Sequence, residues 1–151
     1  MSLLRRDRWQ SIQTLRLLEG GIDYFERVEA VLAAAKKSIY LEVYIFSADS
    51  QAKKIVDILC LAAQRGVEVK VILDWLGSSP FQYEKDFLSA GVQLSYYNPA
   101  WFGTLGFSRT HRKLIVVDEL VAFVGGVNIC DDSKDVLGNQ LPGMRWDLAV
   151  S

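Results

Sequence analysis

Histidine is the residue type that this sequence has least of, since its 151 residues include one, His111. Cysteine (two residues) and proline (three residues) are also scarce, so neither a disulfide framework nor a proline-rich linker can organise the chain. One histidine and two separated cysteines are too few for a zinc site, and we expect neither a metal nor an organic cofactor. We expect Cys60 to be a small core residue and both thiols to be reduced.

An excess of one charge and long apolar runs are also missing. The 17 basic and 18 acidic residues give a net charge of −1, which argues against a broad surface for nucleic acid. No apolar run reaches the ~18 residues of a membrane-spanning helix, and no signal-peptide pattern is present. Half of the residues are hydrophobic, which is enough to form the core of one folded domain.

Apolar periodicity predicts that strands and helices alternate along the chain. Strands are predicted over 14–18, 38–46, 67–73, 92–97, 114–117, 120–124 and from 146 onward, and helices over 22–35, 51–65 and 80–90. Strand–helix–strand alternation is typical of parallel strands with right-handed crossovers. We therefore expect an α/β fold over residues 14–151, with a mixed, largely parallel sheet and helices on both faces. Residues 1–13 form the expected N-terminal tail, whose first three residues could be a foreign leader.

The most informative stretch runs from His111 to Asn128. His111 and Lys113 are two positions apart at the start of a predicted strand, so their side chains share a face. A tight turn leads to a second strand, which ends at Gly125 and Gly126, where backbone can approach a ligand closely. An imidazole, an ammonium, an amide and backbone N–H groups would meet there, which suits a phosphate. The alternative is a surface histidine beside an unrelated lysine.

Three acidic residues are further candidates. Glu42 interrupts an apolar strand, where a carboxylate is costly unless paired, so it belongs either to a structural ion pair or to the wall of an active cleft. Asp74 follows the strand 67–73 at the edge where open α/β sheets bind ligands, although helix capping or turn formation explains it equally well. Asp118 lies at the turn, with strand parity opposite to Lys113, and we interpret it as structural.

The spacing His-x-Lys, four residues, Asp, six residues, Gly-Gly-x-Asn resembles the signature of the phospholipase D superfamily. Leu-Glu-x-Tyr-Ile-Phe at 41–46 and Leu-Asp-x-x-Gly-Ser at 73–78 resemble segments of bacterial cardiolipin synthases within that superfamily. The resemblance extends over residues 14–151 and implies a phospholipase D-like catalytic half-domain. One departure is Gly126, because many members have serine or threonine there and could contact phosphate through the hydroxyl.

The resemblance implies phosphatidyl transfer through a covalent phosphohistidine. In that reaction His111 would be the nucleophile. Lys113, Asn128 and the backbone N–H groups of Gly125 and Gly126 would hold the phosphoryl oxygens while negative charge develops on them. These residues are therefore the expected catalytic and phosphate-binding groups, and the family reaction implies no metal.

Asp147 lies at the start of the last predicted strand and matches an acidic residue that accepts a hydrogen bond from the nucleophilic histidine in this superfamily. The alternative is a surface ion pair with Arg145. The apolar strand stops at Ser151, so we expect one half of a longer enzyme. Phosphoryl transfer also needs an acid for the leaving group. A second histidine would supply it, from another half in the same polypeptide or from a second copy.

Three functions compete on this evidence. The first is a cardiolipin synthase-like transferase that acts on phosphatidylglycerol, peripherally at the cytoplasmic face of the bacterial inner membrane. Its aromatic, glycine-containing loop over 98–109 would suit a lipid surface, or else folds onto its own core. The second is a nuclease or phosphodiesterase of the superfamily that acts as a dimer and needs a basic groove, although we expect no nucleic acid. The third is a non-catalytic lipid-binding or scaffold fragment, against which the intact His111, Lys113 and Asn128 argue.

Overall fold

The computed structural model of the protein describes residues 14–99, 108–131, 133, 139–142 and 147–151. Its elements, in chain order, are β1 (Leu17–Glu19), α1 (Gly20–Ala34), β2 (Ser38–Val43), α2 (Ser50–Gln64), β3 (Glu68–Asp74), α3 (Glu84–Ala90), β4 (Gln93–Tyr97), β5 (Lys113–Val117), β6 (Val121–Gly125) and β7 (Leu148–Val150). Every predicted strand and helix is present with shifted ends. The predicted tail, most of the aromatic loop and Arg145 lie outside the described residues.

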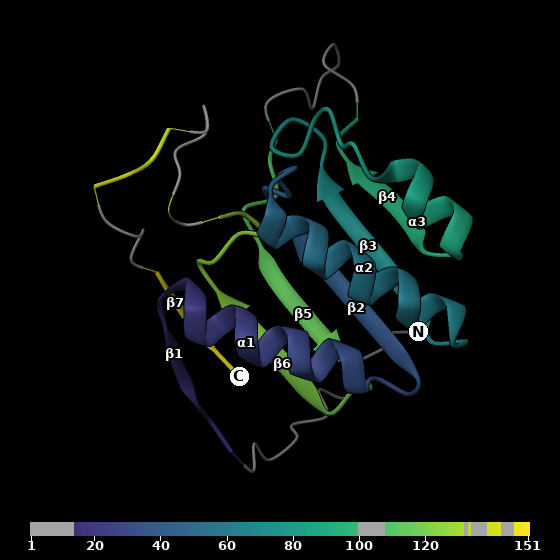
Figure 1. Ribbon diagram of the computed structural model, residues 1–151, viewed down its shortest axis with the longest axis horizontal. Coiled ribbons are helices and arrows are strands. Elements are labelled where there is room, and N and C mark those ends of the chain that lie inside the picture. The colour runs from purple at the N-terminus through teal and green to yellow at the C-terminus, as the bar shows by residue number, and fades with distance from the viewer. Residues whose placement is uncertain (1–13, 100–107, 132, 134–138, 143–146) are drawn as a thin grey trace, which may run out of the picture.

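The strands form one sheet in the order β1-β7-β6-β5-β2-β3-β4 (Figure 1). β2, β3 and β4 are parallel, as the crossovers through α2 and α3 require. The other neighbouring pairs are antiparallel. The predicted mixed α/β fold is confirmed, but the sheet is mostly antiparallel. The reason is that β5 and β6 form a hairpin whose first strand runs antiparallel to β2, and β7 and β1 continue the sheet beyond it in antiparallel pairs.

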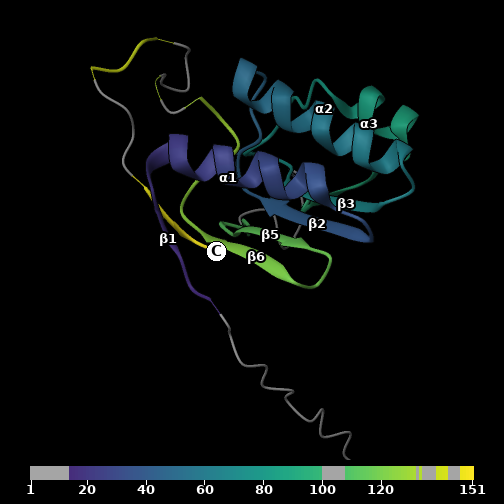
Figure 2. The same ribbon diagram turned by 60° about the horizontal axis from the view of Figure 1, so that its bottom comes forward.

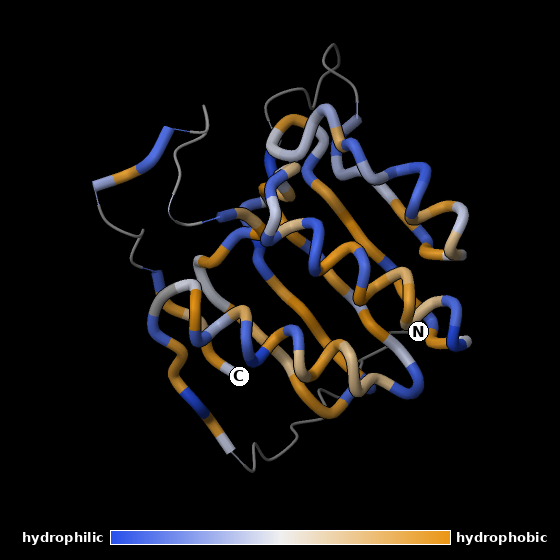
Figure 3. Tube along the Cα trace, in the orientation of Figure 1, coloured by the Kyte–Doolittle hydropathy of each residue, from blue (hydrophilic) through white to orange (hydrophobic). Residues whose placement is uncertain are grey.

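The described helices α1, α2 and α3 form a single layer over one face of the sheet (Figures 1 and 2). Burial along β2 agrees with this arrangement, because Ile39, Leu41 and Val43 are at most 2% exposed. Tyr40 and Glu42 point to the opposite face and are only half-buried. Figure 3 shows the apolar strands beneath amphipathic helices. Helices were predicted on both faces, but the described residues place them on one.

The helix-free face of the sheet leaves apolar side chains in solvent. Val124 and Leu17 are each 55% exposed, and Ile72 is 39% exposed. Each alternates with buried residues of its own strand, so all three lie on the face away from the helices. An apolar surface of this kind is typical of a site that another polypeptide or a membrane covers.

The turn between β5 and β6 is joined to the start of the central strand β2. Asp118 and Glu119 have φ values of 54° and 59°, the left-handed conformation of a type I′ hairpin turn. The Asp118 carboxylate accepts hydrogen bonds from the backbone N–H groups of Lys36, Lys37 and Ser38 at 2.7–3.2 Å. This carboxylate fixes the hairpin against the junction of α1 and β2, so its role is structural, in agreement with its strand parity.

We predict that Asp118→Asn destabilises the protein more at neutral pH than in acid. The N–H groups of Ser38, Lys37 and Lys36 hold the pKa of Asp118 below its ordinary value. The resulting stabilisation is present above the unfolded-state pKa of about 3.9 and is lost as the pH falls through the folded-state pKa. Asparagine tolerates the left-handed backbone, so the turn itself is preserved.

The measurement is the thermal unfolding midpoint of both proteins from neutral pH into the acid range, where the two curves should converge. Glu119→Gln, on the same turn, is the matched control and should follow the wild type throughout. A difference between Asp118→Asn and wild type that stays constant with pH would contradict the electrostatic account.

Candidate active site

His111 and Lys113 lie at the start of β5, beside the residues that follow β2. The exposed His111 ring stacks on Tyr44, with ring centroids 4.2 Å apart and planes inclined by 18°. The Lys113 Nζ atom donates a hydrogen bond to the His111 carbonyl oxygen at 2.9 Å and lies 5.5 Å from the centroid of the Tyr44 ring. The two predicted site residues are therefore brought together around one aromatic ring.

Asn128 reaches the same region from the other side of the chain. Its Oδ1 atom accepts a hydrogen bond from the N–H of Ile45 at 3.1 Å. The next residue, Ile129, forms an isolated parallel bridge with Phe46. Because Oδ1 is used by the backbone, the NH₂ group of Asn128 is the half that can donate to a phosphoryl oxygen. The segment after β2 therefore contacts both Asn128, through Ile45, and His111, through the Tyr44 ring.

Gly125 and Gly126 allow close packing of β7 and Asp147 against the end of β6. The N–H of Gly126 donates to the carbonyl oxygen of Leu148 at 2.9 Å, so this group is bonded within the sheet, and its contact with phosphate stays a prediction. A Cβ atom on Gly125 would lie 2.3 Å from that same carbonyl oxygen, and one on Gly126 would lie 1.9 Å from Oδ1 of Asp147. The missing side chains are what allow β7 and Asp147 to approach β6. Phosphate binding by the N–H of Gly125 stays a prediction.

Asp147 is half-buried and lies against Gly126. Its Oδ1 atom accepts a hydrogen bond from the N–H of Leu148 at 2.9 Å. Among the described residues, the hydrogen bonds and ion pairs of Asp147 include none to His111, so the predicted contact is not formed in this structure. The reason is that the carboxylate is held over Gly126, whereas the imidazole is stacked on Tyr44.

Asp74 is buried, at 1% exposure, and organises the end of β3. Its Oδ1 atom accepts hydrogen bonds from the N–H groups of Leu76 and Gly77 at 3.1 and 3.0 Å. Its Oδ2 atom accepts one from the N–H of Thr110 at 2.9 Å. A buried carboxylate is tolerated here because three backbone donors satisfy it. Asp74 therefore forms a turn and also fixes the residue before His111.

Glu42 fixes the same residue through its side chain. The Thr110 hydroxyl donates to Oε1 of Glu42 at 2.6 Å. Arg112 lies 3.5 Å from the same oxygen, but its side chain is 76% exposed, so this ion pair contributes little. Both acidic residues thus hold Thr110, whose importance the sequence pattern did not indicate. A lone threonine before the motif gives no signal, because its partners are more than 30 positions away.

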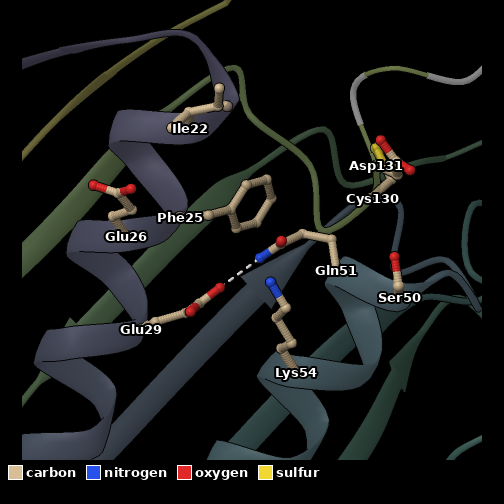
Figure 4. Close-up of a pocket in the computed structure, with 10 residues that line it drawn as sticks. Ile22, Phe25, Glu26, Glu29, Ser50, Gln51, Lys54, Cys130 and Asp131 are labelled. Carbon is tan, nitrogen blue, oxygen red and sulfur yellow. Dashed lines mark hydrogen bonds between the residues drawn. The ribbon is translucent and has the colours of Figure 1, made fainter.

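The His111 ring borders a small cavity of about 130 Å³, lined by Tyr97, Arg109, Thr110, His111 and Arg112. Arginine is well suited to binding an anion, and two of the five lining residues are Arg109 and Arg112. A larger cavity of about 370 Å³ lies between α1 and α2 (Figure 4), where Gln51 donates to Glu29 at 2.7 Å. No residue of the His-x-Lys motif lines it, so the candidate active site is the smaller cavity.

Two negative findings apply to the described part of the chain. Its His, Cys, Asp and Glu residues form no group of three or more that could hold a metal ion. None of its helices combines the length and the apolar character that crossing a membrane requires.

A family model and several known proteins are similar in sequence to this chain. A family model described as "Cardiolipin synthase, PLD-like domain" matches residues 28–137. Cardiolipin synthase B of Salmonella typhimurium is 36% identical over 148 residues, which are 94% of this chain and 35% of that protein. The major cardiolipin synthase of Bacillus subtilis is 32% identical over 121 residues, which are 77% of this chain and 25% of that protein. The chain thus spans about a third of these relatives or less.

The fold is also that of a solved structure. The phospholipase D family member Nuc from Salmonella typhimurium superimposes with a TM-score of 0.65 at 22% sequence identity. The superposition covers 91% of this chain and 80% of Nuc. At this identity the similarity establishes a common fold, and the residues of the site must be argued from their own geometry.

We predict that Asp74→Asn lowers the free energy of unfolding by about 1–3 kcal/mol, because a buried group that accepts three backbone N–H bonds is disturbed. Urea unfolding measures this loss. The NMR signals of the His111 ring should also shift, since Thr110 is released. Asp57→Asn is the control, because Asp57 is 54% exposed and pairs with Lys53 on the surface of α2. Equal losses in both variants would contradict the role assigned to Asp74.

Proposed function

The chain belongs to the cardiolipin synthase family of phospholipase D-like domains, and on that premise we propose that it carries the nucleophile of a phosphatidyltransferase. The proposed reaction joins two phosphatidylglycerol molecules into cardiolipin and releases glycerol. One observation supports it above the others: the only histidine of the chain is exposed, is stacked on an aromatic ring and has a lysine ammonium beside it.

In the proposed first step, a ring nitrogen of His111 attacks the phosphorus of the donor lipid. A nitrogen–phosphorus bond forms, the bond from phosphorus to the glycerol oxygen breaks, and a general acid protonates that oxygen. In the second step, a hydroxyl of the acceptor lipid gives its proton to the same group and attacks phosphorus. The nitrogen–phosphorus bond then breaks, so cardiolipin leaves and His111 is restored.

Lys113 and Asn128 are proposed to stabilise the phosphoryl oxygens during both steps. The ammonium of Lys113 and the NH₂ group of Asn128 are donors, and both lie near the end of β2 that supports His111. Preorganised donors of this kind lower the barrier because the charge on these oxygens grows in the transition state. Asp147 is proposed to accept a hydrogen bond from the His111 ring in the complete site.

The general acid is proposed to be a second imidazole, supplied by another catalytic half in the same polypeptide or by a second copy of this chain. One imidazole cannot attack phosphorus and protonate the leaving oxygen on its opposite side in the same displacement. The helix-free face, with Val124 and Leu17 exposed, offers an apolar surface on which such a partner could pack.

A nuclease or phosphodiesterase is the second candidate, and the fold it shares with Nuc favours it. The lipid transferase is preferred because the sequence is 36% identical to a cardiolipin synthase and only 22% identical to Nuc. The net charge of −1 also disfavours a nucleic-acid surface. We place the protein at the cytoplasmic face of the bacterial inner membrane, in peripheral contact with its lipid substrate.

We predict that His111→Ala abolishes cardiolipin formation in the complete enzyme, because no other group of this half can form the phosphohistidine. Lys113→Ala should lower the rate on the order of 100-fold, as the loss of a preorganised charge contact does. The assay is conversion of radiolabelled phosphatidylglycerol in vesicles. Lys70→Ala is the control, because Lys70 also lies over a tyrosine ring, that of Tyr40, at 5.4 Å. His111→Ala with activity within a few-fold of wild type would exclude the proposal.

We also predict that the 151-residue chain alone makes little or no cardiolipin while it is monomeric. The purified chain is incubated with phosphatidylglycerol vesicles, and its mass in solution is measured in parallel. Weak activity that rises with self-association would agree with two copies sharing one site. Robust turnover by a species shown to be monomeric would rule out the requirement for two imidazoles.

A further inference from the structure

The aromatic ring beneath His111 has no role in the mechanism so far. Tyr44 stacks on the imidazole at 4.2 Å, and the Lys113 ammonium lies 5.5 Å from the same ring. We propose that Tyr44 is a positioning residue, whose ring fixes the plane of the His111 imidazole and the place of the Lys113 ammonium. This inference rests on the proposed function, because it assigns a role to Tyr44 in presenting the nucleophile.

The main chain from Tyr44 to Phe46 is held by side chains of two other segments, those of Ser78 and Asn128. The Ser78 hydroxyl donates to the carbonyl oxygen of Tyr44 at 3.0 Å and accepts from the N–H of Phe46 at 3.0 Å. The N–H of Ile45, between them, donates to Asn128 at 3.1 Å. Each residue from Tyr44 to Phe46 therefore has a backbone group fixed by a side chain from elsewhere. If the Tyr44 ring is to hold the His111 imidazole in one orientation, its own backbone must be fixed in this way.

Gly77 provides the space that the ring occupies. A Cβ atom on Gly77 would lie 2.9 Å from both Cδ2 and Cε2 of Tyr44, and 2.3 Å from its carbonyl oxygen. Any side chain at this position would push the ring away. The N–H of Gly77 is in turn bonded to Asp74, the carboxylate that also holds Thr110, the residue before His111. One turn after β3 therefore fixes both partners of the stack, Tyr44 from one side and His111 through its neighbour.

The stack also suits the chemistry of the nucleophile. When a ring nitrogen of His111 bonds to phosphorus, the imidazole acquires positive charge. The face of a tyrosine ring is electron-rich and attracts cations, so the contact strengthens as the bond forms. The same property attracts the Lys113 ammonium. The contacts of the Tyr44 side chain with His111 and Lys113 are made by its ring.

The single histidine of the chain allows a direct spectroscopic test without lipid. In the folded wild-type chain, the carbon-bound protons of the His111 ring should show the upfield ring-current shift of a stacked aromatic neighbour. Tyr44→Phe should keep this shift, and Tyr44→Leu should abolish it. Tyr40→Leu is the matched control: Tyr40 is on β2, has Lys70 5.4 Å from its ring, and should leave His111 unchanged.

Reactivity is the second readout, with phosphoramidate as the phosphoryl donor and mass spectrometry to quantify phosphohistidine, which can form only at His111. Tyr44→Leu should react about tenfold more slowly than wild type, because orientation and cation–π stabilisation are both lost. Tyr44→Phe and Tyr40→Leu should react at rates close to wild type. Circular dichroism establishes that each variant is folded, and Tyr44→Met replaces Tyr44→Leu if the latter does not fold.

Two results would overturn the role of Tyr44: a wild-type His111 ring without a ring-current shift, or a folded Tyr44→Leu chain that reacts with phosphoramidate at the wild-type rate. Neither measurement depends on lipid transfer. If the complete enzyme makes no cardiolipin, the proposed function fails, while the shift and the phosphoramidate rates still test the support of His111 by Tyr44.

Discussion

The buried carboxylate of Asp74 is the constraint on which the rest of the site depends. A carboxylate with 1% exposure must be fully hydrogen-bonded, and the donors available to it are backbone N–H groups of two segments that are distant in sequence. One segment is the turn after β3, which contains Gly77. The other contains Thr110 and leads into His111. Because both must meet one side chain, the position of the imidazole is decided by the core of the sheet rather than by the loop that carries it.

The β5–β6 hairpin is held at its turn by a second carboxylate, that of Asp118. Asp118 accepts hydrogen bonds from backbone groups at the start of β2, so the strand that begins at Lys113 is anchored at its far end as well. The motif spacing between Lys113 and Asp118 is therefore the length of β5. Asp118 is therefore part of the signature although it lies at the other end of β5 from His111. It fixes the register of β5 against β2, and that register determines where His111 lies.

The single helix layer has a consequence for how a complete enzyme is built. The described residues cover one face of the sheet with helices and leave the apolar side chains of Leu17, Ile72 and Val124 exposed on the other face. The same chain contains one imidazole for a reaction proposed to need two. An incomplete set of catalytic groups and an uncovered surface are what a half-site is expected to show, whether its partner belongs to the same polypeptide or to another copy.

Local sequence determined the helices and strands and the relative placement of the neighbouring motif residues. Alternation at period two puts His111 and Lys113 on one face and Asp118 at a turn, and the alternation of strands with helices predicts that β2, β3 and β4 are parallel. Local sequence is the basis of both predictions. It could not show that β5 pairs with β2, that Tyr44 lies beneath His111, or that Gly126 makes room for Asp147. These contacts join residues far apart in the chain, and such pairings depend on the closure of long loops and on packing across the whole sheet. Local propensity acts over a few residues, so only the tertiary structure could decide them.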